Sequence, residues 1–149
     1  MPKFPVAVSV LAGLTILVVA ACDATGATDG TTPEPTAVID LTGTSWTLVS
    51  VGGSAPVEGT DAWLAFGPNG EITGSTGCNN LIGSYAVDGT ALSFSTLGTT
   101  GMACPEDDLM AQDASVPEAL TNVTGWEVDG DGQLHLTGAT ELVFQPRAA

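Results

Sequence analysis

The chain of 149 residues contains 17 acidic residues and only two basic ones, which gives a formal net charge of −15 at neutral pH. Nucleic acids and anionic lipid headgroups are bound chiefly through Lys and Arg, so this composition argues against both as ligands. The length suffices for one domain of about 105 residues once the N-terminal segments described next are set aside.

Residues 1–21 have the organisation of a secretory signal peptide, with a cation at Lys3, an apolar stretch over 6–19 and small residues up to Ala21. The apolar stretch is shorter than the roughly 20 residues of a membrane-spanning helix, which favours a cleaved leader. The sequence Val19-Ala20-Ala21-Cys22 resembles the bacterial lipobox, which implies cleavage between Ala21 and Cys22 and diacylation of Cys22. The protein is then exported and lipid-anchored on the extracytoplasmic side of a bacterial membrane. The alternative is an ordinary secretory leader with an incidental cysteine.

Residues 22–40 consist mainly of Thr, Gly, Ala, Pro and acidic residues with almost nothing to bury, which predicts a disordered tether. All 17 acidic residues follow Cys22, while cleavage would remove Lys3 and leave Arg147 as the one basic residue, a net charge of −16. Two interpretations of this acidity remain open. It attracts cations or a basic partner protein, or it only keeps a tethered domain soluble.

Between residues 41 and 146, short apolar or alternating runs are separated by turn residues every eight to ten positions, which predicts one antiparallel all-β domain. In Leu134-His135-Leu136 the alternation directs both leucines inward and the histidine outward. Further candidates for the core are Trp46, Leu48, Phe66, Phe94 and Phe144. Eight strands, a number that suits a barrel, are expected at 44–51, 62–66, 71–74, 83–87, 91–95, 125–128, 133–137 and 141–145.

Tight hairpin turns are predicted at Asn69-Gly70, Asp88-Gly89 and Asp131-Gly132, because these residues tolerate positive φ. The sequence Asp129-Gly130-Asp131-Gly132 also resembles part of a calcium loop. The glutamate expected at the twelfth position of such a loop is replaced by Thr140, so a hairpin turn is the better interpretation.

A helix is predicted to start near Pro105, because Glu106, Asp107 and Asp108 follow it and the helix dipole favours carboxylates in a first turn. Pro117 is expected to interrupt this helix. Ser115 and Glu118 have the spacing of a capping box, which predicts a second short helical piece up to residue 123.

Three motifs resemble the META domain of HslJ-like envelope lipoproteins: Gly74-Ser75-Thr76-Gly77-Cys78-Asn79-Asn80, Gly83-Ser84-Tyr85 and Thr100-Gly101-Met102-Ala103-Cys104. The resemblance covers about residues 41–145. It implies a mainly β (α+β) fold, an open or cracked antiparallel β-barrel of about eight strands with a helical segment packed across it. Members of this family are associated with stress or drug tolerance of the envelope, and the fold resembles that of lipoprotein pilots of secretion pores. The resemblance implies no reaction and no cofactor.

Cys78 and Cys104 are the two cysteines left once Cys22 is lipidated, and in an oxidising compartment an even remainder predicts one disulfide. The alternative is a redox or metal-binding pair. Zinc needs three or four ligands, and His135, on a distant predicted strand, is the one histidine that could join the cysteines.

A catalytic apparatus is hard to assemble from this sequence. His135 is the only histidine and has no nucleophile motif beside it, while Glu106, Asp107 and Asp108 are explained as a solvated helix start. The chain also lacks a phosphate-binding glycine loop with lysine. We therefore expect no enzymatic activity, no cofactor and no metal, with a small carboxylate-dependent hydrolase as the alternative.

Five residues are expected to gather near the disulfide, where they would either bind a ligand or support the loop: Asn79, Asn80, Tyr85, Thr100 and Met102. The function expected is that of a membrane-anchored envelope accessory protein. It would bind an apolar small ligand or dock an envelope protein, and a pilot-like partner-binding module of a secretion complex is a further alternative.

Overall fold

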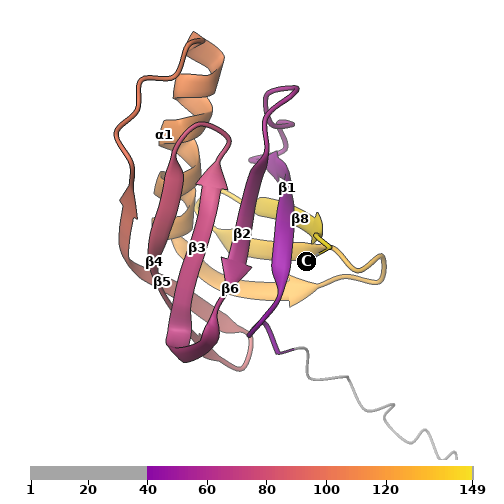
Figure 1. Ribbon diagram of the computed structural model, residues 1–149. Helices are drawn as coiled ribbons and strands as arrows, with labels where there is room; N and C mark the ends of the chain where they lie inside the picture. The colour runs from indigo at the N-terminus through magenta and orange to yellow at the C-terminus, as the bar shows by residue number, and fades with distance from the viewer. Residues whose placement is uncertain (1–39, 149) are drawn as a thin grey trace, which may run out of the picture. The chain divides into compact units, whose positions relative to one another are not determined.

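The alternating runs of the sequence form a closed ring of eight antiparallel strands in the computed structural model, which describes residues 40–148 (Figure 1). The predicted signal peptide, the lipidation site and the tether up to residue 39 lie outside the described residues. The strands are β1 (Ser45–Val51), β2 (Ala62–Phe66), β3 (Glu71–Thr76), β4 (Asn80–Asp88), β5 (Ala91–Thr99), β6 (Val123–Val128), β7 (Leu134–Gly138) and β8 (Leu142–Pro146).

Each strand pairs with its neighbours in chain order, and β1 pairs with β8 to close the ring, with Leu48 opposite Phe144. The narrowest join is between β5 and β6, which share the one pair Ala91 and Gly125. The N–H of Trp126 adds a hydrogen bond to the carbonyl of Thr90 at 3.0 Å. The predicted fold class, a mainly β antiparallel barrel of about eight strands with a helix packed against it, is confirmed. The barrel was expected to be open or cracked, whereas the pairing of β1 with β8 closes its ring.

The barrel interior is filled by its own side chains. In β2 every second residue is buried, which is the period of a strand with one face inward. The five aromatic and aliphatic core candidates are confirmed, as are Leu134 and Leu136. Fully burying one such side chain contributes roughly 1.5–3 kcal/mol. The largest fully buried side chains are Phe66, Phe144, Leu41, Leu64, Ile72, Leu81, Leu92, Leu120, Leu134, Leu136, Leu142 and Asn79.

Hairpin turns are found at the three predicted places, with positive φ at Asn69, Gly70, Gly89 and Gly132. The second is displaced by one residue, because Asp88 still pairs with Ala91 and the turn residues are Gly89 and Thr90. Asn69 and Gly70 have φ of 61° and 75°, the left-handed pair that a two-residue hairpin turn requires. In the β6–β7 turn, Asp129 Oδ1 accepts hydrogen bonds from the N–H groups of Asp131 and Gln133, at 2.9 and 2.8 Å. This carboxylate therefore stabilises a hairpin turn, as expected, because its Oδ1 atom accepts hydrogen bonds from the backbone of the turn.

Several strands extend beyond their predicted bounds, and two do so by three residues or more, since β4 starts at Asn80 instead of 83 and β5 runs to Thr99 instead of 95. Their pairing register shifts between Ile82 and Ser84, and Thr96 opposite has a φ of 50°. Such a bulge breaks the alternation of a strand, so the residues beyond it do not follow the period that defined the prediction.

The prediction of two helical pieces is wrong. One helix, α1 (Asp107–Thr121), runs through Pro117 without a break. Ser115 donates its hydroxyl to the carbonyl of Gln112 at 3.0 Å and does not form the expected capping box. Buried residues on both sides of the proline, Val116 and Ala119 among them, pack into the barrel core, and this packing outweighs the backbone hydrogen bond lost at the proline.

The helix contacts β5 most extensively, then β3 and β1, and its buried face belongs to the barrel core. Its buried residues are Leu109, Gln112, Val116, Ala119 and Leu120. Among the described residues, α1 is too short and too polar to span a membrane. Residues 40–148 close their own ring and bury their own core, which is the property of a domain that can fold alone.

Candidate functional site

The predicted site residues concentrate at one end of the barrel, which we call the apex. It carries the β1–β2 loop (52–61), the β3–β4 turn (77–79), the segment 100–106 and the first turns of α1 (Figure 1). A disulfide joins Cys78 in the turn to Cys104 in the segment, with 5.9 Å between their Cα atoms. The predicted pairing is therefore present, and it fixes the approach to α1 against the end of β3.

Asn79 holds the same segment by hydrogen bonds. Its side chain is 2% exposed, and its Oδ1 accepts from the Thr100 hydroxyl at 2.7 Å and from the Met102 N–H at 2.8 Å. Its Nδ2 donates to the Met102 carbonyl at 3.1 Å and to Asp113 Oδ2 at 2.9 Å. These four bonds occupy both ends of the amide, so Asn79 acts as a clamp between the β3–β4 turn, segment 100–106 and α1.

Asp113 and Gln112 tie α1 to this clamp. The Asp113 carboxylate accepts hydrogen bonds from the Thr76 hydroxyl and from the backbone N–H of Asn79. Gln112 donates from Nε2 to the Thr76 carbonyl at 2.6 Å and accepts at Oε1 from the Val57 N–H at 2.6 Å. The helix is thereby bound to the β1–β2 loop on one flank and to the disulfide segment on the other.

Five residues were predicted to lie together near the disulfide. Asn79, Asn80, Thr100 and Met102 do so, whereas the prediction is wrong for Tyr85. Asn80 donates its backbone N–H to the Thr100 hydroxyl at 3.1 Å, which brings it to the same cluster. Tyr85 lies five residues further along β4, where its hydroxyl donates to the Gly67 carbonyl at 3.0 Å and its ring meets that of Phe66 edge-on. An extended strand advances about 3.3 Å per residue, so Tyr85 belongs to the opposite end of the barrel.

Asp113 also lies close to the two cysteines, since its carboxylate and both sulfurs are within 4.8 Å of one another. The zinc alternative had paired the cysteines with His135, which is on β7 between other partners. In the structure the two sulfurs form the disulfide, and the Asp113 carboxylate accepts hydrogen bonds from Thr76 and Asn79. The three side chains that could hold a metal ion therefore already have bonding partners within the domain. All buried side-chain N and O atoms of the described residues have a hydrogen-bond partner.

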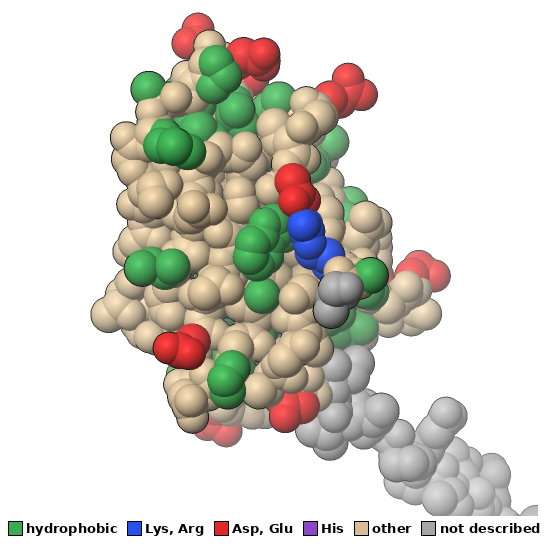
Figure 2. All heavy atoms as spheres, viewed as in Figure 1, with side chains coloured by type: hydrophobic (Ala, Val, Ile, Leu, Met, Phe, Trp, Pro, Cys, Tyr) green, Lys and Arg blue, Asp and Glu red, His purple; other side chains and the backbone are tan. Residues whose placement is uncertain are grey.

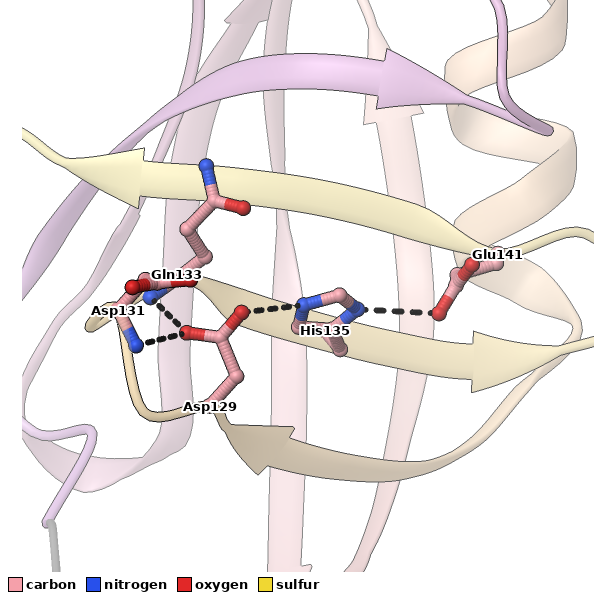
Figure 3. A network of polar contacts seen from close by, with 5 residues as sticks. All are labelled: Asp129, Asp131, Gln133, His135 and Glu141. Carbon is pink, nitrogen blue, oxygen red and sulfur yellow. Dashed lines mark hydrogen bonds and ion pairs between the residues drawn. The ribbon is translucent and has the colours of Figure 1, made fainter.

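His135 is held between two carboxylates (Figure 3). Its Nδ1 lies 3.1 Å from Glu141 Oε1 and its Nε2 lies 3.1 Å from Asp129 Oδ2, with 22% of the side chain exposed. The hydrogen bond to Glu141, followed by that to Asp129, raises the pKa of His135 above its ordinary value of 6.5. The pKa of Asp129 is lowered, chiefly by the Gln133 N–H and then by the imidazole. The histidine faces outward as predicted, but it is part of a charged network.

We expect replacement of His135 with Gln to destabilise the domain more at pH 5.5 than at pH 8.5, by about 1 kcal/mol at the lower pH. The folded pKa is raised, so the stabilisation is fully present below the ordinary histidine pKa and is lost as the pH rises through the folded value. Urea unfolding of both proteins at the two pH values measures the difference. Equal losses at both pH values would contradict this assignment.

The same network has a direct reporter, because His135 is the only histidine of the chain. Its ring proton resonance should titrate with a midpoint above 6.5 in the wild type. Replacement of Glu141 with Gln removes the principal cause of the shift and should move the midpoint down, while replacement of the exposed Asp88 should leave it in place.

Arg147, the one basic residue of the described chain, is already paired. Its guanidinium donates to Asp61 Oδ2 at 2.7 Å and lies 5.3 Å from the centre of the Trp63 ring. Figure 2 shows this single blue side chain next to an acidic and an apolar one, on a face that also carries scattered apolar and acidic side chains. The hydrogen bond from Arg147 lowers the pKa of Asp61. The remaining acidic residues of the domain therefore have no Lys or Arg among the described residues to neutralise them.

Together these observations define a small antiparallel barrel whose apex is fixed by one helix, one disulfide and an asparagine clamp. The META domain family matches residues 39–149, so the chain belongs to the META domain family, as its motifs predicted. An NMR structure of a protein from Burkholderia xenovorans is similar at 30% identity and a TM-score of 0.60, over 73% of this chain and 85% of that one. A second NMR structure is similar at 27% identity and a TM-score of 0.56, over 69% and 88%. No curated protein matches at a significant level.

Three residues of the apex were not predicted from the sequence: Thr76, Gln112 and Asp113. Only a weak pattern in the sequence points to Gln112 and Asp113, the two residues on α1. Gln112 lies three residues after Leu109 and four before Val116, both buried, so helical spacing alone places this polar residue on the inward face. A polar residue at such a position needs hydrogen-bond partners, but the sequence does not say which elements supply them.

Proposed function

We propose that this protein is an exported envelope lipoprotein, anchored through Cys22, whose META domain is a non-enzymatic module that docks a partner protein on the extracytoplasmic side of the membrane. The observation that carries this proposal is the filled barrel. Phe66, Phe144 and Leu64 are each about 1% exposed and occupy the interior. A small apolar ligand would need space inside the ring, so function is assigned to the outer surface.

Four surface hollows lined by described residues support the same choice. They are open surface grooves with volumes of about 310–450 Å³, and two of them flank the single residue pair that joins β5 to β6. Partner proteins bind to such surfaces when apolar groups are available, and Ile82 and Val87 are 63% and 43% exposed. The pilot-like role that the family resemblance implies would be one form of this docking function.

The carboxylate-dependent hydrolase is disfavoured by where the carboxylates lie. Two catalytic carboxylates face each other across a cleft about 5–9.5 Å apart in enzymes of that kind. Glu106, Asp107 and Asp108 are exposed at the start of α1. Of these three residues, only Asp108 lines one of the four grooves described above. The clustered carboxylates elsewhere are bonded to His135, to Arg147 or, for Asp113, to Thr76 and Asn79.

The anchor is tested by metabolic labelling with an acyl-chain analogue in a bacterial host. We expect Cys22→Ala to abolish incorporation of the label, because the acyl chains attach at that cysteine in the proposed processing. Cys78→Ala is the matched control and should retain the label, since Cys78 is bonded to Cys104 in the domain. Label retained in Cys22→Ala would overturn the anchor.

Docking is tested separately, with a photo-cross-linking amino acid placed in intact cells at exposed positions such as Ile82, Val87 and Ala111. We expect one discrete product, identified by mass spectrometry, from the positions of one face and none from the others. If every exposed position yields only the uncross-linked protein, the docking function is wrong.

A further inference from the structure

We propose that the apex groove between α1 and the β1–β2 loop binds a partner segment that carries an apolar anchor residue flanked by Lys or Arg. This inference rests on the proposed docking function and names its site and ligand chemistry. The groove has a volume of about 310 Å³. Its walls are Ala55, Pro56 and Val57 from the loop and Asp108, Ala111 and Ser115 from α1.

The lining of the groove is mainly apolar and its floor is fixed. Gln112 forms the floor and bonds to Val57 on one side and to Thr76 on the other, both at 2.6 Å. A groove whose walls are held by such bonds is preformed, so a ligand does not have to order them. The four residues that α1 contributes to the lining, Asp108, Ala111, Gln112 and Ser115, have the spacing of one helix flank.

This groove is not required by the barrel ring. The two grooves beside Ala91 and Thr124 follow directly from the missing strand pairs between β5 and β6. The apex groove instead lies between a helix and a loop, and the loop forms its own short bridge between Val51 and Ser54. This groove is therefore not a consequence of the weak pairing between β5 and β6, which makes it the stronger candidate for binding.

The charge at the groove selects the partner. Asp108 is part of the wall, and Glu58, Glu106 and Asp107 are exposed nearby at the apex, while the domain's one arginine is paired with Asp61. Three of the 17 acidic residues precede residue 40, so 14 belong to the domain against that one arginine. A second copy of this chain, or an anionic membrane surface, would bring like charges together. A partner segment that carries Lys or Arg is instead attracted by these carboxylates.

The test uses the chain from residue 23 onwards, exported into an oxidising compartment, with its amide resonances assigned. The probe is a nine-residue peptide of alternating Lys and Leu, added up to about 1 mM at physiological salt. We expect shifts of the Ala55, Val57 and Ala111 amides. Peptides with Glu in place of Lys, or Ser in place of Leu, should bind at least about fivefold more weakly, because each lacks one of the two required contacts.

Matched variants locate the binding. Ala111→Phe fills the groove and should weaken the peptide at least about tenfold, whereas Ala114→Phe makes the same change on an exposed helix position outside the lining and should not. Asp108→Asn should weaken the peptide about two- to fivefold. Asp107→Asn removes the same charge from the same first turn and should have a smaller effect.

Absence of shifts at the groove, or equal affinities for Ala111→Phe and Ala114→Phe, would overturn the inference. The docking function has a separate outcome, because cellular cross-links at Ile82 or Val87 but not at Ala111 would place the partner on another face. That result would overturn the apex groove as the binding site but would leave the proposed docking function standing. Variants are compared only when their near-ultraviolet circular dichroism matches that of the wild type.

Discussion

Replacement of both Cys78 and Cys104 with serine is expected to lower the free energy of unfolding by about 3–4 kcal/mol. The two residues are 26 positions apart, and in the chain-entropy model a cross-link of that span restricts the unfolded chain by this amount. Small domains are stable by about 5–15 kcal/mol in total. The bridge is therefore expected to provide a substantial share of the stability of this barrel.

Urea unfolding should show a second signature of the same mechanism. A cross-linked unfolded chain is more compact and exposes less surface, so the slope of free energy against urea should be larger in the double-serine variant. The wild type with its disulfide reduced is the control and should resemble the variant. Equal midpoints for oxidised and reduced protein would show that the bridge contributes nothing to stability.

The sequence predicts the strands well because their inward residues have a clear period. Leu134-His135-Leu136 and the runs around Trp46 and Phe66 alternate as half-buried strands do, and each is found in its expected strand. Turn chemistry is equally local, so Asn69-Gly70 is found with the expected positive φ. The largest errors in strand bounds lie at the β4–β5 bulge, where one additional residue reverses the alternation.

The helix and the site depend on contacts between distant residues, which local patterns do not contain. Pro117 predicts a break on local grounds, yet packing of Val116 and Leu120 into the core keeps α1 continuous. The role of Asp113 follows from its approach to Thr76 and Asn79, more than 30 positions earlier in the chain. Tyr85 was misplaced because sequence proximity to Asn79 was taken as proximity in space, while an extended strand separates the two.

The second large effect is expected at Asn79. Its replacement with Ala should lower the free energy of unfolding by about 3 kcal/mol, because the buried Asn79 side chain makes four hydrogen bonds, one of them to the charged Asp113 carboxylate, and all four are lost. The neighbouring Asn80 is the control. Its side chain is exposed and makes no hydrogen bond with described residues, so Asn80→Ala should cost less than about 0.5 kcal/mol.

Urea unfolding of the two alanine variants measures these costs. Similar losses for Asn79→Ala and Asn80→Ala would contradict the clamp that the hydrogen bonds define. Amide exchange gives a local readout of the same clamp. The N–H groups of Thr100 and Met102 should exchange faster in Asn79→Ala, while those of β7, which pairs with β6 and β8, should change only with the global stability.

The clamp and the disulfide hold the same segment, so their effects should not add. With the bridge intact, segment 100–106 stays held beside the β3–β4 turn, so Asn79→Ala leaves the Met102 backbone groups and Asp113 Oδ2 without that partner in place. Without the bridge, segment 100–106 can separate from the β3–β4 turn and water can reach those groups. Asn79→Ala should therefore cost at least about 0.5 kcal/mol less in the double-serine background, and equal costs in the two backgrounds would mean that the two devices act independently.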